Sequence, residues 1–185
     1  MGFGNELSGI AASMPMIIGG GSLLAGLVGN SKLAIYFTLG VFLQDKILNT
    51  FILKKLIFGN MKGNWKYRPS NIPCEGCGLF ADCSLCGKDK LAVKRHIGMP
   101  SGHSQTMCFS ATFWTMYMLK KHSKSGIIIA IWLLALIIMI DRMRRNCHTM
   151  FQVTVGAVIG VALGYSYWLL VEKELLNGNI SATLY

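Results

Sequence analysis

Long apolar stretches separated by short polar ones dominate this chain. Five segments are apolar enough to form membrane helices, at residues 8–28, 33–58, 104–119, 126–140 and 149–171. Residues 126–140 carry no charged side chain, and the uncharged run at 149–171 is long enough to cross a hydrocarbon core of about 30 Å. The pattern predicts an all-α fold, a polytopic membrane bundle of about five transmembrane helices that forms a single domain over residues 1–185.

The second segment is interrupted by polar residues. Asp45, Lys46 and Asn49 fall inside it. Because charged groups are costly in hydrocarbon, we expect these side chains to face a neighbouring helix or a polar cavity. The alternative is that the helix bends out of the membrane at Asp45 and runs along its surface.

Residues 59–100 form a small extramembrane loop with a cysteine-rich centre. Two Cys-x-x-Cys-Gly knuckles occur in it, at Cys74 and Cys77 and at Cys83 and Cys86. Four thiolates in paired knuckles suit a structural zinc ion held tetrahedrally. In an oxidising compartment the same thiols would form disulfides instead. The sequence therefore predicts a compact zinc site, with disulfides as the alternative and the loop as a possible binding element for a protein partner.

The net charge of +10 changes the list of expected partners. Most of this charge lies outside the apolar segments, where anionic lipid head groups and a phosphorylated substrate are natural partners. No basic stretch is interleaved with aromatic residues as in surfaces that stack nucleic-acid bases. We therefore expect a lipid phosphate and a membrane as partners, and no nucleic acid.

A first island of candidate chemistry lies at the start of the segment 104–119. Ser101 is a good helix N-cap, and the free backbone N–H groups at such an end favour an anion. Gly102 allows the backbone to approach a phosphate closely. His103 can then protonate the leaving oxygen as a general acid.

A second island lies between the last two apolar segments. Arg142 precedes His148 by six residues, and Gln152 follows that histidine by four, which places both side chains on one helical face. An imidazole can attack phosphorus when an acceptor holds its other nitrogen as a donor. This spacing predicts His148 as the nucleophile, Gln152 as its orienting acceptor and Arg142 as a cation for the phosphate oxygens.

These residues resemble the motifs of the type 2 phosphatidic acid phosphatase superfamily, which are Lys-x6-Arg-Pro, Pro-Ser-Gly-His and Ser-Arg-x5-His-x3-Asp. The resemblance implies that His148 attacks phosphorus and that His103 acts as the acid, with no metal required. It also implies a phosphate cradle formed by Arg68, Arg142 and a lysine. The likeness is greatest to dolichyldiphosphatases, whose third motif also carries Gln in place of Asp.

Three positions depart from the superfamily pattern. Asp141 replaces the serine before Arg142 and puts an anion beside a phosphate-binding cation. Lys62 is one residue too close to Arg68, whereas Lys55 is several residues too far. Lys55 sits at a helix end, as the family lysine does, so we favour it and leave Lys62 as the alternative.

The sequence predicts an integral-membrane lipid phosphatase that hydrolyses a polyisoprenyl diphosphate or related lipid phosphate through a phosphohistidine. Its resemblance implies a membrane of the endoplasmic reticulum or one derived from it, with the site on the lumenal side. Zinc and the excess of basic residues near the site favour the cytoplasmic side instead. Two other hypotheses stay open: an inactive scaffold that retains the fold, and a binder or transporter of lipid phosphate that uses the cradle without chemistry.

Overall fold

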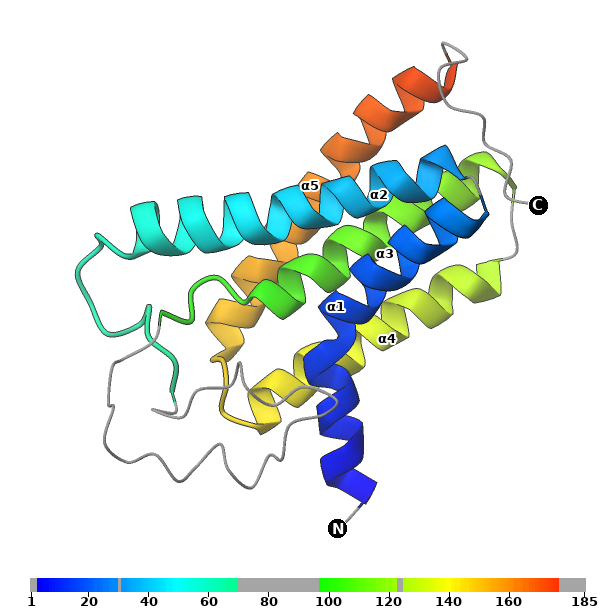
Figure 1. The fold of residues 1–185 in the computed structure, drawn as a ribbon. Coiled ribbons are helices and arrows are strands. Elements are labelled where there is room, and N and C mark those ends of the chain that lie inside the picture. Colours follow the sequence, from blue (N-terminus) through cyan, green and yellow to red (C-terminus); the bar gives the residue numbers. More distant parts are fainter. Residues whose placement is uncertain (1–2, 30, 70–96, 123–124, 177–185) are drawn as a thin grey trace.

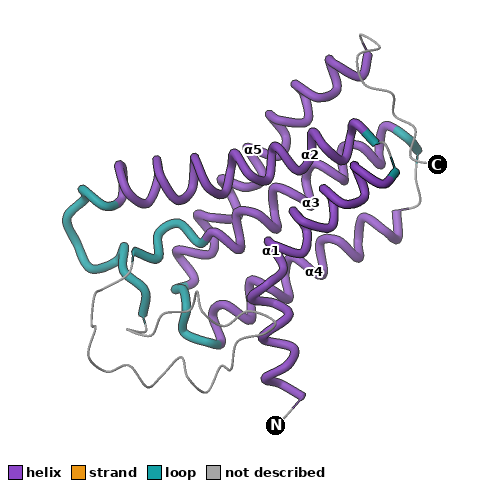
Figure 2. Tube along the Cα trace, viewed as in Figure 1, coloured by secondary structure: helices purple, strands orange, loops and turns teal. Residues whose placement is uncertain are grey.

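The computed structural model describes residues 3–29, 31–69, 97–122 and 125–176. The regular structure of these residues is helical, apart from a single bridge between Tyr67 and Ile97. The helices are α1 (Phe3–Val28), α2 (Lys32–Phe42), the π-helix η1 (Leu43–Phe58), α3 (Gly102–Lys120), α4 (Ser125–Arg144) and α5 (Met150–Leu176). The expected all-α fold is confirmed for the described residues, and each predicted apolar segment falls on a helix (Figures 1 and 2).

Among the described residues, two helices are long and apolar enough to cross a membrane. They span Ser125–Arg144 and Met150–Glu174, and a shorter apolar helix spans Ser13–Val28. Several large apolar side chains on these helices are solvent-exposed in the bundle, as lipid-facing side chains would be, including Ile129 and Val158. The protein therefore has the character of a membrane protein, and the full count of five spans stays a prediction.

The interrupted segment does not bend away from the bundle at Asp45. It continues from α2 into η1 as one long helical stretch that lies along α3 (Figure 1). A π-helix closes each turn between residues five apart, so Gln44 and Asn49 lie on one face. Gln44 Nε2 donates to Thr106 Oγ1 at 2.7 Å, and Asn49 Nδ2 donates to Gln105 Oε1 at 2.6 Å. The expectation that the polar residues of this segment face a neighbouring helix or a polar cavity is thus confirmed for Asn49, and Gln44, which was not predicted, does the same.

The tightest packing in the molecule joins α3 and α5. Gly156, Gly160 and Gly164 form a stripe on α5, one residue in every four, and face backbone atoms of α3. A Cβ atom at Gly156 would lie 2.5 Å from the carbonyl oxygen of Ser101, and one at Gly164 would lie 2.6 Å from that of Phe109. The lack of side chains on this stripe therefore lets the two backbones touch, as in close packing of membrane helices.

An aromatic cluster packs α2, α3 and α5 together, away from the end of the bundle where α3 begins. Phe37 of α2, Phe109 and Phe113 of α3 and Trp168 of α5 are almost fully buried and lie in ring contact. Ring centroids of Phe113 and Trp168 are 5.5 Å apart with nearly perpendicular planes, a favourable edge-to-face arrangement. This cluster ties three helices together and leaves the end where α3 begins free for polar residues.

Only two of the six cysteines, Cys108 and Cys147, lie among the residues that the structure describes. The four of the predicted zinc site, Cys74, Cys77, Cys83 and Cys86, lie outside the described residues, so that prediction stays open. Within the described part of the chain, no group of three or more His, Cys, Asp or Glu side chains gathers at one point. Cys108 is a buried free thiol, whereas Cys147 is disulfide-bonded.

Candidate active site

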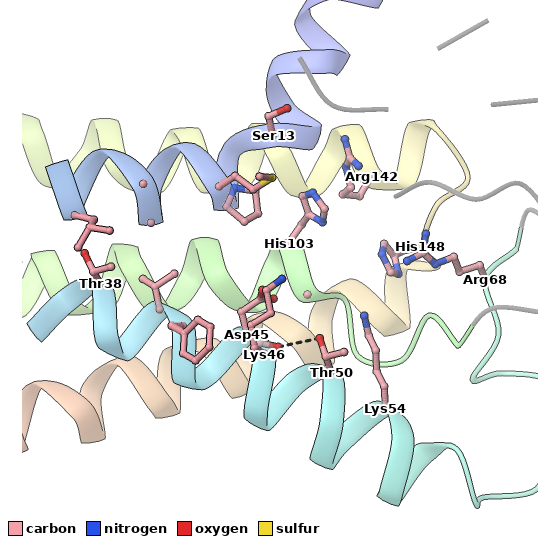
Figure 3. Close-up of a pocket in the computed structure, with 18 residues that line it drawn as sticks. Ser13, Thr38, Asp45, Lys46, Thr50, Lys54, Arg68, His103, Arg142 and His148 are labelled. Carbon is pink, nitrogen blue, oxygen red and sulfur yellow. Dashed lines mark hydrogen bonds and ion pairs between the residues drawn. The ribbon is translucent and has the colours of Figure 1, made fainter. Parts of the chain in front are cut away.

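A cavity of about 640 Å³ lies at the end of the bundle where α3 begins. Its polar lining comes from five helices and two connecting segments: Ser13, Thr38, Asp45, Lys46, Thr50, Lys54, Arg68, His103, Arg142 and His148. Figure 3 shows both histidines and Arg142 around the same space. Four basic side chains and one carboxylate line the cavity, so its charge suits an anion.

Gln152, in the first turn of α5, connects all three motifs. It is fully buried, and its Nε2 donates to the carbonyl oxygens of Trp65 at 2.9 Å and Tyr67 at 2.8 Å. Its backbone carbonyl accepts a hydrogen bond from the Ser101 N–H at 3.1 Å. Because the amide nitrogen is engaged by two acceptors, Oε1 must be the atom that faces His148, whose Nδ1 lies 3.2 Å away.

This contact selects the tautomer of His148. Oε1 of Gln152 can only accept, so Nδ1 of His148 carries the proton and donates it. The second ring nitrogen, Nε2, then keeps its lone pair, and His148 is among the residues that line the cavity. In the neutral imidazole, this geometry leaves the nitrogen with the free lone pair on the far side of the ring from Gln152.

Electrostatics keep this imidazole neutral. His148 lies in the connection between α4 and α5 and is only 4% exposed. Burial, followed by the positive charges of Arg68 and Lys54, lowers the pKa of His148 to about 3, against a smaller opposing effect of the Gln152 hydrogen bond. At neutral pH the lone pair of the imidazole is consequently available without the help of a separate base.

Arg142, in the last turn of α4, is held by its neighbour in sequence. Its side chain is 1% exposed, and its Nη2 donates to Asp141 Oδ2 at 2.8 Å. Its Nε has no hydrogen-bond partner among the described residues, although it is buried. A buried N–H group without a partner is costly, and an anion in the cavity would satisfy it.

The start of α3 has the cap that the sequence predicts. Ser101 is fully buried and its Oγ accepts from Ser104 N at 3.4 Å and from Ser104 Oγ at 2.9 Å. Gly102 and the half-buried His103 follow in the first turn and line the cavity. The structure thus brings the N-terminus of α3, with its favourable dipole for an anion, to the same space as His148.

Arg68 reaches the site from the segment after η1. The backbone of that segment is tied to the residues before α3, because the carbonyl oxygen of Lys66 accepts from Gly98 N at 2.7 Å and Met99 N at 3.1 Å. The buried Lys66 ammonium group donates to the carbonyl oxygen of Gly59 at 2.9 Å and to that of Met61. These bonds hold Arg68 at the cavity, beside the histidine.

The structure brings a different lysine to the cavity from the one we favoured. Lys54 lines it, whereas Lys55 and Lys62 do not. Lys55 is exposed, and its ammonium group lies over the ring of Phe51, 5.5 Å from the centroid. The reason is the π-helical turn of η1, which puts Asp45, Thr50 and Lys54 on the face that borders the cavity.

Sequence reasoning expected Asn49 to face a neighbouring helix, but it missed Gln44 and Gln105, its partners in a polar network behind the start of α3. Gln105 Nε2 donates to Gln44 Oε1 at 2.9 Å and to the Gln44 carbonyl oxygen at 3.1 Å, and Gln105 Oε1 accepts from Asn49. A Cβ atom on Gly102 would lie 3.4 Å from Asn49 Oδ1, so η1 supports the first turn of α3 closely. The only signal in the sequence was the polar character of Gln44, Asn49 and Gln105 inside apolar segments.

Comparison with known proteins agrees with this arrangement. Dolichyldiphosphatase 1 from Dictyostelium discoideum is 35% identical over 86 residues, which cover 43% of this chain and 38% of that protein. The matched region therefore spans well under half of the length of this relative. No solved structure matches the chain. The family model described as PAP2 superfamily matches residues 33–175, which hold every described residue of the three motifs, and the chain belongs to that superfamily.

Proposed function

We propose that this protein is a membrane phosphatase that hydrolyses a lipid phosphate or diphosphate, most simply a polyisoprenyl diphosphate, through a phosphohistidine. The observation that carries the proposal is the orientation of His148. Gln152 accepts from one ring nitrogen, which leaves the other with its lone pair, and the same histidine borders a cavity lined by basic residues. Membership in the PAP2 superfamily and the partial likeness to a dolichyldiphosphatase support the same chemistry.

In the first half of the reaction, Nε2 of His148 forms a bond to the terminal phosphorus and the bond from phosphorus to the bridging oxygen breaks. His103 gives its proton to the leaving oxygen, which departs as lipid alcohol or lipid monophosphate. Arg68, Arg142 and Lys54 stabilise the non-bridging oxygens, together with the backbone N–H groups after Ser101. In the second half, His103 takes a proton from water, which attacks phosphorus, and the bond to His148 breaks to release phosphate.

One observation favours a second candidate, a protein that retains the fold but turns over slowly. Asp141 stands where the family motif has serine, and its carboxylate already occupies one Nη group of Arg142. A phosphate must compete with that carboxylate for the guanidinium. This alternative predicts weak or absent phosphatase activity, and a cysteine-rich loop that is needed for assembly with a partner.

Phosphate release by the detergent-purified protein from farnesyl diphosphate tests the proposal, with and without EDTA and beside His148→Ala. We expect EDTA-resistant release that His148→Ala abolishes, and a phosphate label on the wild-type protein that the variant lacks. A label that persists in His148→Ala would remove this residue from the nucleophile's role. Absence of release from this substrate and from phosphatidic acid would favour the inactive fold.

A further inference from the structure

The cavity extends well beyond the residues that hold phosphate. Its apolar lining lies on α1 and α2 and consists of Pro15, Met16, Gly19, Gly20, Leu23, Val41 and Phe42. On α1 the lining residues run from Ser13 to Leu23, a rise of about 15 Å at 1.5 Å per residue. This distance is about half of a hydrocarbon core, so the cavity leads from the site towards the middle of the membrane.

The packing of α1 on α2 explains why there is space between them. The helices touch where they are joined, since a Cβ atom at Gly26 would lie 2.8 Å from Ile35 Cγ1. About two helical turns nearer the site, the contact between α1 and α2 is looser. A Cβ atom at Gly19 would lie 3.6 Å from Val41 Cγ1, and one at Gly20 would meet nothing within 4 Å. The two helices therefore form a wedge that is closed at their connection and open towards His148.

The wedge is also open to the lipid side of the bundle. Met16 and Phe42 line the cavity yet are 80% and 55% exposed, so its apolar rim faces outward. An apolar chain lying there would cover exposed apolar surface at both helices. Its other end would meet Lys54, Arg68 and Arg142, whose charges require an anionic group.

We propose that the wedge between α1 and α2 holds the apolar chain of the substrate and that Gly20 determines how bulky a chain it accepts. This inference rests on the proposed function, because the occupant is the chain of the lipid whose phosphate the basic residues bind. A side chain at position 20 would project into the wedge, where glycine now leaves open space. The neighbouring Gly21 offers a matched control: a Cβ there also meets nothing within 4 Å, but this residue does not line the cavity.

The test compares Gly20→Leu with Gly21→Leu on a 15-carbon substrate, farnesyl diphosphate, and a five-carbon one, dimethylallyl diphosphate. We expect Gly20→Leu to lower the ratio of kcat/KM for the long substrate over the short one about tenfold, the effect typical of one misplaced methyl group in a pocket. Gly21→Leu should leave this ratio within twofold of wild type. An equal loss on both substrates with Gly20→Leu, or the same ratio in both variants, would overturn the inference.

A second measurement separates the wedge from the catalytic proposal. Gly20→Cys and Gly21→Cys are labelled with a maleimide, with and without farnesyl phosphate, and the labelled fraction is read on the α1 peptide by mass spectrometry. Protection at position 20 and its absence at 21 would support the wedge even if the wild type releases no phosphate. Equal labelling at position 20 with and without the lipid would refute it, whether or not the protein is an active phosphatase.

Discussion

Replacement of Gln152 by glutamate is the sharpest test of how His148, the proposed nucleophile, is held. The two side chains have the same shape, but glutamate presents an oxygen where the Nε2 group now donates to the carbonyl oxygens of Trp65 and Tyr67. Two buried acceptors lose their donor and face a negative charge. Each unsatisfied buried group costs about 1–3 kcal/mol, so we expect Gln152→Glu to lower the free energy of unfolding by roughly 2–6 kcal/mol.

The same substitution should reduce activity. The active arrangement needs Oε1 in contact with His148. If holding the glutamate in that position costs about 3 kcal/mol of the destabilisation, the rate falls roughly a hundredfold. The carboxylate also stabilises the protonated imidazole and so raises the pKa of His148, which leaves a smaller share of rings with a free lone pair at the acid end of the pH range. The assay is phosphate release by purified Gln152→Glu between pH 5 and 8, with thermal unfolding measured on the same samples.

The pH dependence of Tm distinguishes this explanation from a nonspecific loss of stability. A protonated glutamate regains one donor towards the carbonyl oxygens, so the gap in Tm between variant and wild type should narrow as the pH falls. Gln152→Met, which has similar bulk but neither donor nor carboxylate, should show a gap without this narrowing. A Gln152→Glu protein with unchanged Tm and higher activity would refute the reasoning, because a carboxylate would then be the better orienting group here.

Two further predictions follow from the electrostatics of the site. Lys54→Ala should lower kcat/KM about 10–100-fold, because it removes a cation that lines the cavity, and Lys54→Arg should restore part of the loss. Lys55→Ala should change kcat/KM less than twofold. Equal losses at both positions would contradict the π-helical register. The pKa of His148 is about 3 in the folded protein against an ordinary value of 6.5, so on acidification the unfolded chain takes up the proton first and stability falls. Between pH 7 and 5 the free energy of unfolding should fall by about 2 kcal/mol from this group alone. The measurement is denaturant unfolding of the detergent-solubilised protein, in which His148→Gln should abolish this loss. A variant whose stability depends on pH as in the wild type would assign the effect to other groups.

The helices and the meeting of the motifs could be predicted because they depend on long patterns. The apolar segments identified the helices to within about five residues. If the chain crosses a membrane five times, as the sequence predicts, the two histidine islands fall at one end of the bundle. The N-cap at Ser101 and the pairing of His148 with Gln152 are local, four residues or fewer in range, and both are present. Such contacts follow from backbone geometry that hardly varies between proteins.

Which lysine lines the cavity could not be predicted, because it depends on the type of helix. At about 100° per residue in an α-helix, Lys54 would lie on the side opposite Asp45, nine residues earlier. At about 82° per residue in a π-helix, nine residues bring the chain back to the same face. Residues 43–58 carry no sequence signal for the wider turn, and Lys55 was favoured only because it sits at a helix end, as the family lysine does.

The position of Gln152 has a consequence for how the site holds together. Its side-chain amide joins His148 to the carbonyl oxygens of Trp65 and Tyr67, just before Arg68 in the chain. Its backbone carbonyl binds Ser101 at the start of α3. The tautomer of His148 and the placement of Arg68 therefore depend on one buried side chain. Gly98 belongs to the same arrangement, since a Cβ there would lie 2.6 Å from Gln152 Oε1 and 2.9 Å from Arg68 Cγ.

This coupling explains why glutamine suits the position better than the aspartate of the superfamily pattern. An aspartate is one methylene shorter and would offer only acceptors to two carbonyl oxygens that already point at it. Glutamine meets both needs at once, because it donates to the segment that carries Arg68 and accepts from the histidine. Glutamine stabilises a protonated imidazole less than a carboxylate would. Burial and neighbouring cations already keep His148 neutral, so in the proposed mechanism it does not need that help before it attacks.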